Sequence, residues 1–178
     1  HSDKNFLTVA FRPATVCGFA PRLRLDLSVN ILTNHAINNN KIIVFGGEQL
    51  RPNLHILDYC YAVEAFIKAP KEKIKNQIFN VGFQNLSILE ISHIVKDVVE
   101  KEFKNKKNIA IEIQESDDIR SYHINSQKIY DILGFKPKNT IENAVLELCN
   151  FFKENDISDS FDNDIYHNVK RLRSLNAK

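Results

Sequence analysis

The chain has 178 residues, of which 43% are hydrophobic, so it is long and apolar enough for one folded domain or a large piece of a bigger one, and it is not disordered. Its 24 basic residues nearly balance its 22 acidic ones, and the net charge of +2 gives no electrostatic basis for binding nucleic acid or a membrane surface. No apolar run approaches the ~20 residues that span a bilayer, and no signal peptide is visible, which predicts a cytoplasmic protein.

The first third of the chain predicts strands that alternate with a helix. Residues 6–11 are apolar and rich in β-formers, as buried strands of parallel sheets are. Apolar residues at helical spacing predict a helix over 26–38, with Asp26 as its N-cap. A second strand follows at 41–45, and a brief extended stretch at 54–57.

The middle of the chain continues the alternation. Asp58 is placed to open a helix over 59–69, and 77–81 is another short apolar strand. Residues 88–103 carry apolar side chains at helical intervals, and a capping box precedes them at Ser87 and Glu90. We expect this stretch to be the most regular helix of the chain.

The last third begins with a strand at 109–113, where apolar and polar residues alternate as in a half-buried strand. Two helices follow, at about 126–133 and at 141–154, and Thr140 is placed to cap the second. The remaining two dozen residues are polar and then basic. Strands that alternate with helices at this spacing are typical of an α/β fold.

Several classes of site have no signal in this sequence. No G-x-G-x-x-G or G-x-x-G-x-x-G follows a strand, so no self-contained dinucleotide site is predicted. Cys17, Cys60 and Cys149 are isolated and lack metal-ligand spacing, and we interpret them as buried structural thiols in a reducing compartment. The chain starts with polar residues in place of a methionine, as a truncated or processed product would.

Three stretches in order carry a resemblance to a known family. Residues 12–18 (RPATVCG) resemble an R-x-x-N/T-V-Y-G segment, residues 45–58 (FGGEQLRPNLHILD) resemble G-x-G-x-x-x-R-D/P-x-x-H-V-x-D, and residues 78–82 (IFNVG) match F-N-V/I-G. These segments are typical of the NAD-dependent epimerase/dehydratase family of extended short-chain dehydrogenases. The resemblance covers roughly residues 6–155, and the tail at 161–170 is similar to endings of some polysaccharide-biosynthesis members.

The resemblance implies a two-lobed enzyme in which a Rossmann domain binds NAD or NADP and a smaller lobe binds a nucleotide-diphosphate sugar. Residues 1–155 are then expected to be the C-terminal substrate-binding portion, made of the last sheet strands and a small mixed α/β lobe, and residues 156–178 a surface extension. The family's catalytic Tyr-x-x-x-Lys precedes the first matched segment, so no catalytic or metal-binding residue is expected here and this piece alone is expected to be inactive. The full-length protein is expected to be a homodimer.

The same resemblance assigns candidate substrate-binding residues. Arg51 is expected at the diphosphate, because arginine offers a permanently charged donor fork, and the alternative is a surface arginine beside a turn. Ile43 and Phe45 share one face of their strand and are expected against the nucleotide base, with ordinary core as the alternative. Asn53 lies on the same strand face as Arg51 and is expected to contact the substrate.

Other candidates come from the segments on either side. Thr15 replaces an asparagine that many members use to hydrogen-bond the sugar, and Pro13 and Ala14 fall where the main chain approaches the nicotinamide. Leu27 falls where the family contacts the diphosphate and base. Asp26, beside it, would repel a diphosphate, so helix capping is the preferred interpretation of that carboxylate.

A second diphosphate arginine is a feature of many family members. The aligned position holds Glu115 here, and Arg120 is expected to supply the charge from a few residues later. His55 and Asp58 are expected to be structural. Two alternatives remain open: a non-catalytic nucleotide-binding or regulatory relative of the same fold, and an unrelated α/β domain with a chance match.

Overall fold

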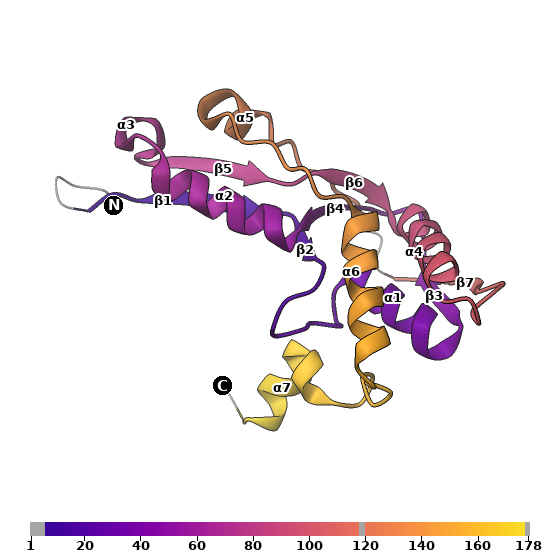
Figure 1. The fold of residues 1–178 in the computed structure, drawn as a ribbon. Helices are drawn as coiled ribbons and strands as arrows, with labels where there is room; N and C mark the ends of the chain where they lie inside the picture. Colours follow the sequence, from indigo (N-terminus) through magenta and orange to yellow (C-terminus); the bar gives the residue numbers. More distant parts are fainter. Residues whose placement is uncertain (1–5, 118–119, 177–178) are drawn as a thin grey trace.

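The computed structural model describes residues 6–117 and 120–176. Residues 1–5 and 118–119 of the expected substrate-binding portion, and residues 177–178 of the expected extension, lie outside the described residues. The elements form two lobes joined by a small central sheet (Figure 1). One lobe, here called the three-helix lobe, contains α1 (Ser28–Asn39), α4 (Ile88–Glu102), α6 (Ile141–Glu154), β3 (Lys41–Phe45) and β7 (Ala110–Gln114). The other, here called the α2 lobe, contains β1 (Val9–Pro13), β5 (Gln77–Val81), α2 (Ile56–Lys68), α3 (Lys71–Ile74) and α5 (Gln127–Leu133).

The three-helix lobe forms because its helices each have one apolar face to bury. Residues of α1, α4 and α6 make one continuous core together with β3, in which Ile42 and Val44 are fully buried. Strand β3 pairs in parallel with β7, from Lys41 opposite Ala110 to Phe45 opposite Gln114. Since side chains alternate along a strand, Ile43 and Phe45 lie on the face of β3 away from this core.

The α2 lobe has a separate core. Strands β1 and β5 pair in parallel along five residues, and Phe79 of β5 is fully buried. The ring of Phe66, on α2, lies 5.2 Å from the ring of Phe79 and 5.3 Å from that of Phe11. Figure 1 shows α2 running along the β1–β5 pair, which brings these rings together.

The central sheet joins the lobes. Strand β2 (Thr15–Cys17) pairs in parallel with β4 (Leu50–His55), and β4 pairs in antiparallel fashion with β6 (Gln84–Ser87). Sequence analysis does not predict β2 or β6, and it predicts only an extended stretch at 54–57 where β4 lies. Pro52 lies inside β4, opposite Asn85, and a proline inside a strand hides it from sequence-based prediction.

Two of the four predicted helix caps are confirmed. Ser87 and Glu90 form the expected capping box of α4, and Thr140 caps α6 with Asn143 as its reciprocal partner. The prediction for Asp26 is wrong, because α1 begins after Leu27 and has no side-chain cap.

The prediction for Asp58 as the opening residue of its helix is also wrong. His55 is the N-cap of α2, and its ring nitrogen Nδ1 accepts from the backbone N–H of Leu57 at 3.2 Å. Asp58 lies in the first turn and is 1% exposed. Its carboxylate accepts three hydrogen bonds from the segment before α6, two of them from the backbone N–H groups of Lys138 and Asn139. It therefore links the two lobes.

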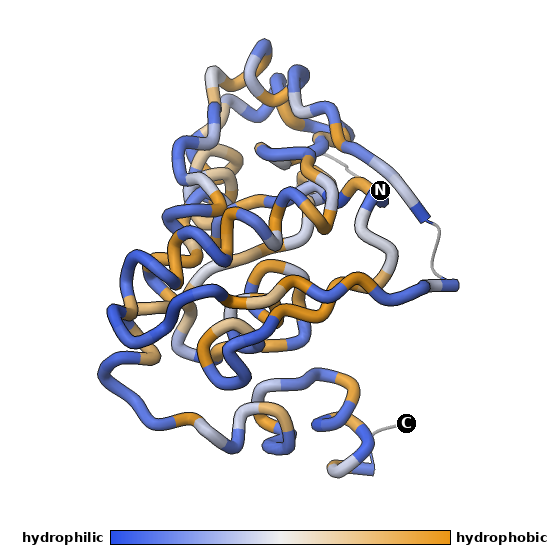
Figure 2. The backbone as a smooth tube through the Cα atoms, turned by 90° about the vertical axis from the view of Figure 1, so that its right-hand side faces the viewer, coloured by the Kyte–Doolittle hydropathy of each residue, from blue (hydrophilic) through white to orange (hydrophobic). Residues whose placement is uncertain are grey.

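The polar tail contains two short helices, η1 (Asp164–Tyr166) and α7 (Asn168–Ser174), which sequence analysis does not predict. Figure 1 shows α7 in yellow beside the end of α6, and Figure 2 shows this segment as a mostly hydrophilic arm. The Leu25 N–H donates to the Tyr166 carbonyl at 2.9 Å. The Asn168 N–H donates to the carboxylate of Asp26 at 2.8 Å, so Asp26 accepts a bond at the start of α7 although it does not cap α1.

Candidate functional site

A pocket of about 250 Å³ lies in the three-helix lobe, between α1 and β3 and beside the start of β4. We call it the Arg51 pocket. It contains three of the residues expected to bind substrate, Ile43, Phe45 and Arg51. Its full lining is Ser28, Ile31, Leu32, His35, Ile43, Phe45, Gln49, Arg51, Ile88 and Ser116.

The walls of this pocket follow from element geometry. Ser28, Ile31, Leu32 and His35 recur three or four residues apart and therefore share one face of α1. Phe45 faces them from β3 and is 55% exposed, which rules out the alternative that it is ordinary core.

A tight turn places Phe45 and Arg51 in the same pocket. Gly46 and Gly47 have φ angles of 77° and 120°, which side-chain-bearing residues rarely adopt. The side chain of Gln49 closes the turn: its Oε1 accepts from the Gly47 N–H, and its Nε2 donates to the Phe45 carbonyl, both at 2.6 Å. The chain thereby reverses between the end of β3 and the start of β4.

The segment after β7 contacts the guanidinium of Arg51 and orients it. Its Nη1 donates to the Leu50 carbonyl at 3.0 Å and to the Arg120 carbonyl, and its central carbon lies 5.5 Å from the centre of the Tyr122 ring. Ser121 fixes this segment, because its hydroxyl accepts from the Leu50 N–H at 3.0 Å. Sequence analysis missed Tyr122, whose cation–π contact adds to the orientation of Arg51.

Arg120 itself is exposed and does not line the Arg51 pocket. The structure brings its backbone, through the carbonyl, into contact with Arg51. Glu115, which stands at the aligned position, is exposed as well.

A second pocket of about 370 Å³ lies on the other side of the start of α1, and we call it the Arg24 pocket. It contains two further expected residues, Pro13 and Leu27. Its full lining is Pro13, Val16, Cys17, Gly18, Ala20, Arg22, Arg24, Leu27, Asn30, Ile56 and Tyr59. The N-terminus of α1 lies between the two pockets, since Leu27 lines this one and Ser28 the other.

Asn30 shapes the Arg24 pocket. Its side-chain oxygen accepts from the Gly18 N–H at 3.1 Å, and its amide donates to the carbonyls of Gly18 and Arg24 at 3.1 and 2.8 Å. Gly18 has a φ of 100°, so this backbone position suits glycine. The Asn30 bridge therefore fixes the loop between β2 and α1.

Besides Arg120, three expected residues line neither of these pockets: Ala14, Thr15 and Asn53. Ala14 is buried, and its N–H donates to the Val81 carbonyl at 2.7 Å. Thr15 lies opposite Asn53 in the β2–β4 pairing. Asn53 is 1% exposed, and its amide donates to the Arg51 carbonyl at 2.8 Å, so it supports the strand that carries Arg51.

Asp26 lines neither pocket, and two donors share its charge. Its carboxylate accepts from Arg24 at 3.0 Å and from the Asn168 N–H at 2.8 Å. Burial raises the pKa of Asp26, but these two donors outweigh burial and hold that pKa below its ordinary value. The repulsion of a diphosphate expected from this carboxylate is therefore reduced by its own partners.

One Tyr-x-x-x-Lys spacing occurs in the tail, at Tyr166 and Lys170, although no catalytic residue is expected in this chain. Tyr166 ends η1, and the Lys170 amine donates to the Phe161 carbonyl at 2.5 Å. Burial and the nearby Asp159 charge raise the pKa of the Tyr166 phenol, the opposite of what a general base requires. This pair belongs to the packing of the tail.

Other titratable groups also have structural surroundings. The His55 ring is buried, with Nε2 3.2 Å from the Glu147 carboxylate, and lines neither pocket. Cys17 and Cys149 are buried, which confirms the interpretation of these two as buried thiols, and burial raises the pKa of both to about 12. For Cys60 that interpretation is wrong, because its thiol is on the exposed side of α2.

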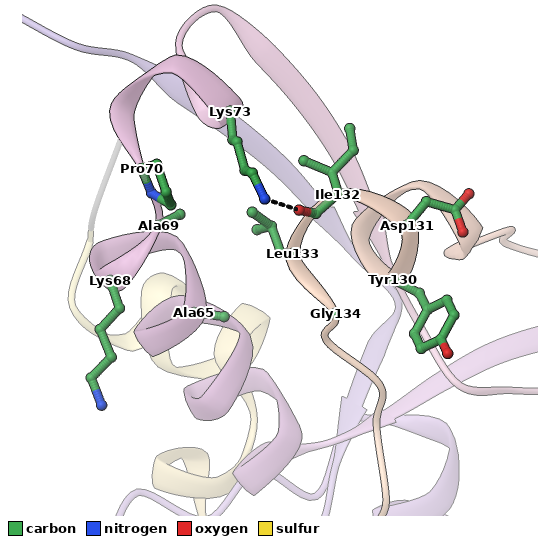
Figure 3. Close-up of a pocket in the computed structure, with 10 residues that line it drawn as sticks. All are labelled: Ala65, Lys68, Ala69, Pro70, Lys73, Tyr130, Asp131, Ile132, Leu133 and Gly134. Atoms are coloured by element: carbon green, nitrogen blue, oxygen red, sulfur yellow. Dashed lines mark hydrogen bonds between the residues drawn. The ribbon is translucent and has the colours of Figure 1, made fainter.

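A cavity of about 900 Å³, larger than the Arg51 and Arg24 pockets, lies between α5 and the α2–α3 turn (Figure 3). Lys73 crosses it, and its amine donates to the Ile132 carbonyl at 3.3 Å. None of the expected site residues lines this groove, so volume alone does not mark the functional site.

Within residues 6–117 and 120–176, no cluster of three His, Cys, Asp or Glu side chains is arranged to hold a metal ion. The helices described over the same residues include none with the length and apolar character needed to cross a membrane.

Comparison with known proteins finds similarities over parts of the chain. Residues 1–82 match the model of the NAD dependent epimerase/dehydratase family. An uncharacterized protein of Methanocaldococcus jannaschii is 31% identical over 102 residues, which cover 55% of this chain and 30% of that protein. The dTDP-glucose 4,6-dehydratase 1 of Escherichia coli is 24% identical over 127 residues, which cover 68% of this chain and 34% of that enzyme.

A solved structure shares the fold. UDP-glucuronic acid 4-epimerase from Bacillus cereus, in complex with UDP-glucuronic acid and NAD, superposes with a TM-score of 0.69 at 21% identity, over 85% of this chain and 47% of that one. The chain thus spans about a third of these curated relatives and about half of the solved enzyme. Residues 1–82 thus resemble the NAD dependent epimerase/dehydratase family, and the chain shares the α/β fold of a solved epimerase.

Proposed function

We propose that residues 1–155 are the nucleotide-sugar-binding portion of an NAD- or NADP-dependent epimerase or dehydratase, and that residues 156–178 are an extension of it. The Arg51 pocket receives the nucleoside, with Ile43 and Phe45 against the base and Arg51 at the diphosphate. The observation that carries this proposal is that Phe45 and Arg51 line one pocket, as a ligand with an aromatic ring at one end and phosphates at the other requires.

The chemistry of Arg51 supports this assignment. An arginine offers a rigid fork of donors that is charged at every physiological pH, which suits phosphate oxygens. Here the Arg120 carbonyl and the Tyr122 ring already orient that fork, so less conformational entropy is lost when a ligand binds. Arg120 and Asn53 then act by supporting Arg51, which differs from the direct substrate contacts predicted from the sequence.

The Arg24 pocket is the proposed place of the sugar. Leu27, which lines this pocket, is proposed to contact the sugar and the diphosphate. Thr15 lies next to the lining residue Val16 and is proposed to contact the sugar from the edge of the pocket, and the backbone at Pro13 and Ala14 is proposed to face the nicotinamide. The N-terminus of α1 lies between the pockets and has no side-chain cap, so its backbone N–H groups favour an anion there. The Bacillus cereus epimerase binds UDP-glucuronic acid and NAD, which supports this class of ligand.

In this proposal the chain positions its substrate and performs no proton transfer. A nicotinamide cofactor accepts hydride from the sugar when bound, and it is held mainly by a Rossmann half outside these residues. The catalytic tyrosine and lysine belong to that half as well, so the chain alone is inactive. The whole protein is proposed to be a cytoplasmic homodimer that acts in polysaccharide biosynthesis.

A non-catalytic nucleotide-binding relative is the second candidate. The one Tyr-x-x-x-Lys spacing in the chain is committed to packing of the tail, which favours a binding role for these residues by themselves. Turnover of nucleotide sugars by the whole protein would distinguish the two candidates, because only the enzyme consumes substrate.

Titration calorimetry of the 178-residue chain with UDP, CDP and GDP tests the site. Arg51→Ala removes a charge-assisted contact of about 1.5–3 kcal/mol, so affinity for the preferred nucleotide should fall about tenfold or more. Arg51→Lys should give an intermediate loss, since the charge remains and the fork does not. Arg12→Ala, on the exposed face of β1, is the matched control and should change nothing. Unchanged affinity in Arg51→Ala would overturn the proposal.

A further inference from the structure

We infer that His35 contacts the nucleobase in the Arg51 pocket, and that the C-terminal segment positions His35 through the ring of Phe161. This inference rests on the proposed function and deepens it, because it assigns base selectivity to two residues that lie 126 positions apart. One of them belongs to the segment expected to be only a surface extension.

The position of His35 on α1 points to the base and away from the phosphates. His35 lies seven residues beyond Ser28 on the same helix face, a distance of about 10 Å along the axis. Anions are favoured at the helix N-terminus, the Ser28 end. A nucleoside diphosphate that lies along α1 with its phosphates at that end places its base between His35 and Phe45.

The imidazole of His35 has the hydrogen-bonding groups needed to recognise a nucleobase. His35 is half-buried, and burial together with the Lys41 charge lowers the pKa of its ring, so the ring is neutral at physiological pH. A neutral imidazole has one donor and one acceptor. Nδ1 lies 3.4 Å from the amide nitrogen of Asn39; when that amide donates to Nδ1, Nε2 carries the proton and can donate to a base carbonyl.

Phe161 of the tail packs against this ring. The two ring centres are 4.9 Å apart with an interplanar angle of 58°, a favourable tilted arrangement. Phe161 therefore restricts the orientation of an imidazole that also lines the pocket.

The neighbour of Phe161 is anchored to the same helix. Ser160 is fully buried; its hydroxyl donates to the Asn34 side-chain oxygen at 2.8 Å and accepts from the Asn38 amide at 3.1 Å. The ring nitrogen Nε2 of His167 lies 2.8 Å from the Ser160 carbonyl. Bonds from α1 on both sides of His35 thus meet at Ser160, and this anchor fixes where Phe161 lies.

Calorimetry with two kinds of probe tests the inference. UDP, CDP, GDP and ADP report base contacts, while inorganic pyrophosphate reports phosphate contacts alone. His35→Ala should weaken binding of the preferred nucleoside diphosphate about fivefold and bring the four affinities together, with pyrophosphate binding unchanged. Phe161→Ala should cause a smaller loss in the same direction, and Phe161→Leu, which keeps an apolar contact, a still smaller one.

Matched controls are His93→Ala, an exposed histidine on α4, and Ile165→Ala, an exposed residue of the tail, and neither should alter selectivity. Equal ratios of the four affinities in wild type and a folded His35→Ala chain would overturn the role of His35. An effect of His35→Ala without one of Phe161→Ala would overturn the role of the tail. If Arg51→Ala weakens every probe while His35→Ala weakens none, the proposed function stands and this inference falls; if the chain binds no nucleoside diphosphate, both fall.

Discussion

Each lobe contains a pair of parallel strands with one face packed against a core. The lobes differ in what lies on the opposite face. In the three-helix lobe, Ile42 and Val44 of β3 bury one face, while Ile43 and Phe45 line a pocket on the other. In the α2 lobe, the rings around Phe79 bury one face of the β1–β5 pair, and the other face is open, with Ile78 47% exposed. Parallel strands are usually covered on both faces.

The difference shows how to judge an exposed apolar residue. Phe45 and Ile78 are exposed to a similar extent, at 55% and 47%. Phe45 faces a helix across a cavity that also holds an oriented arginine, whereas Ile78 lies beside the exposed Asn80 on an open strand face. Exposure indicates a binding residue only where other elements close a site around it.

The largest effect should come from the buried face of the α2 lobe. Phe79→Ala removes a fully buried ring and should lower the free energy of unfolding by about 3–5 kcal/mol. Ile78→Ala, one residue away on the open face, should change it by no more than about 0.5 kcal/mol. Urea denaturation measures both. Similar losses in the two variants would mean that the open face is covered in solution.

The next largest effect should come from the link between the lobes. Asp58→Ala removes a buried carboxylate and leaves the backbone N–H groups of Lys138 and Asn139 without their acceptor, and we expect a loss of about 2–3 kcal/mol. Because this carboxylate joins the two cores, the urea transition should also become less cooperative, with a smaller m-value.

Asp131→Ala is the control for that experiment, since this carboxylate is exposed and accepts from Gln127 of the same helix, α5. A transition of unchanged steepness in Asp58→Ala would show that the two lobes unfold as one unit without this link.

What could be predicted from the sequence depends on how local the interaction is. The capping boxes at Ser87 and Thr140 were predictable because both partners lie within four residues. The cap predictions at Asp26 and Asp58 were wrong, since these carboxylates accept bonds from backbone N–H groups about 80 to 140 positions away, at Asn168 and in the 138–139 segment. Short polar side chains satisfy caps or distant backbone groups equally well, and local spacing does not distinguish these outcomes.

The candidate site divides in the same way. Ile43, Phe45 and Arg51 are joined by one strand and one turn, so a local pattern brings them together. Tyr122 and His35 enter the site from a distant loop and from a helix whose orientation is set by tertiary packing. Phe161 depends on a bond network that includes Ser160, Asn34 and Asn38, for which the sequence holds no periodic signal.

A smaller loss of stability is expected from removing a helix cap in the three-helix lobe, and only one of its two confirmed caps adjoins the Arg51 pocket. Ser87→Ala and Thr140→Ala each remove a helix cap, and each should cost about 1 kcal/mol of stability by urea denaturation. Only Ser87 precedes a pocket residue, Ile88. Ser87→Ala should therefore also weaken UDP, CDP or GDP binding, while Thr140→Ala leaves binding as in wild type. Equal nucleotide affinities of the two variants would show that the cap of α4 does not contribute to the Arg51 pocket.

The smallest expected effect concerns the attachment of the tail, and it depends on pH. The pKa of Asp26 is lower in the folded chain than in an unfolded one, so its stabilising contribution is complete above the ordinary aspartate range, near 4, and is lost as pH falls through the folded-state pKa. Asp26→Asn should lower the melting temperature slightly at pH 6–7, where wild-type Asp26 is ionised and bonded to Arg24 and Asn168. As pH falls below ~4 and through the folded-state pKa, the two melting temperatures should converge, because the wild-type carboxylate then becomes protonated. Asp162→Asn, an exposed position of the same tail, should follow wild type throughout. A difference that persists unchanged into acid would mean that the ionised carboxylate of Asp26 does not hold the tail against α1, and that the neutral contacts at Ser160 and Phe161 carry the attachment by themselves.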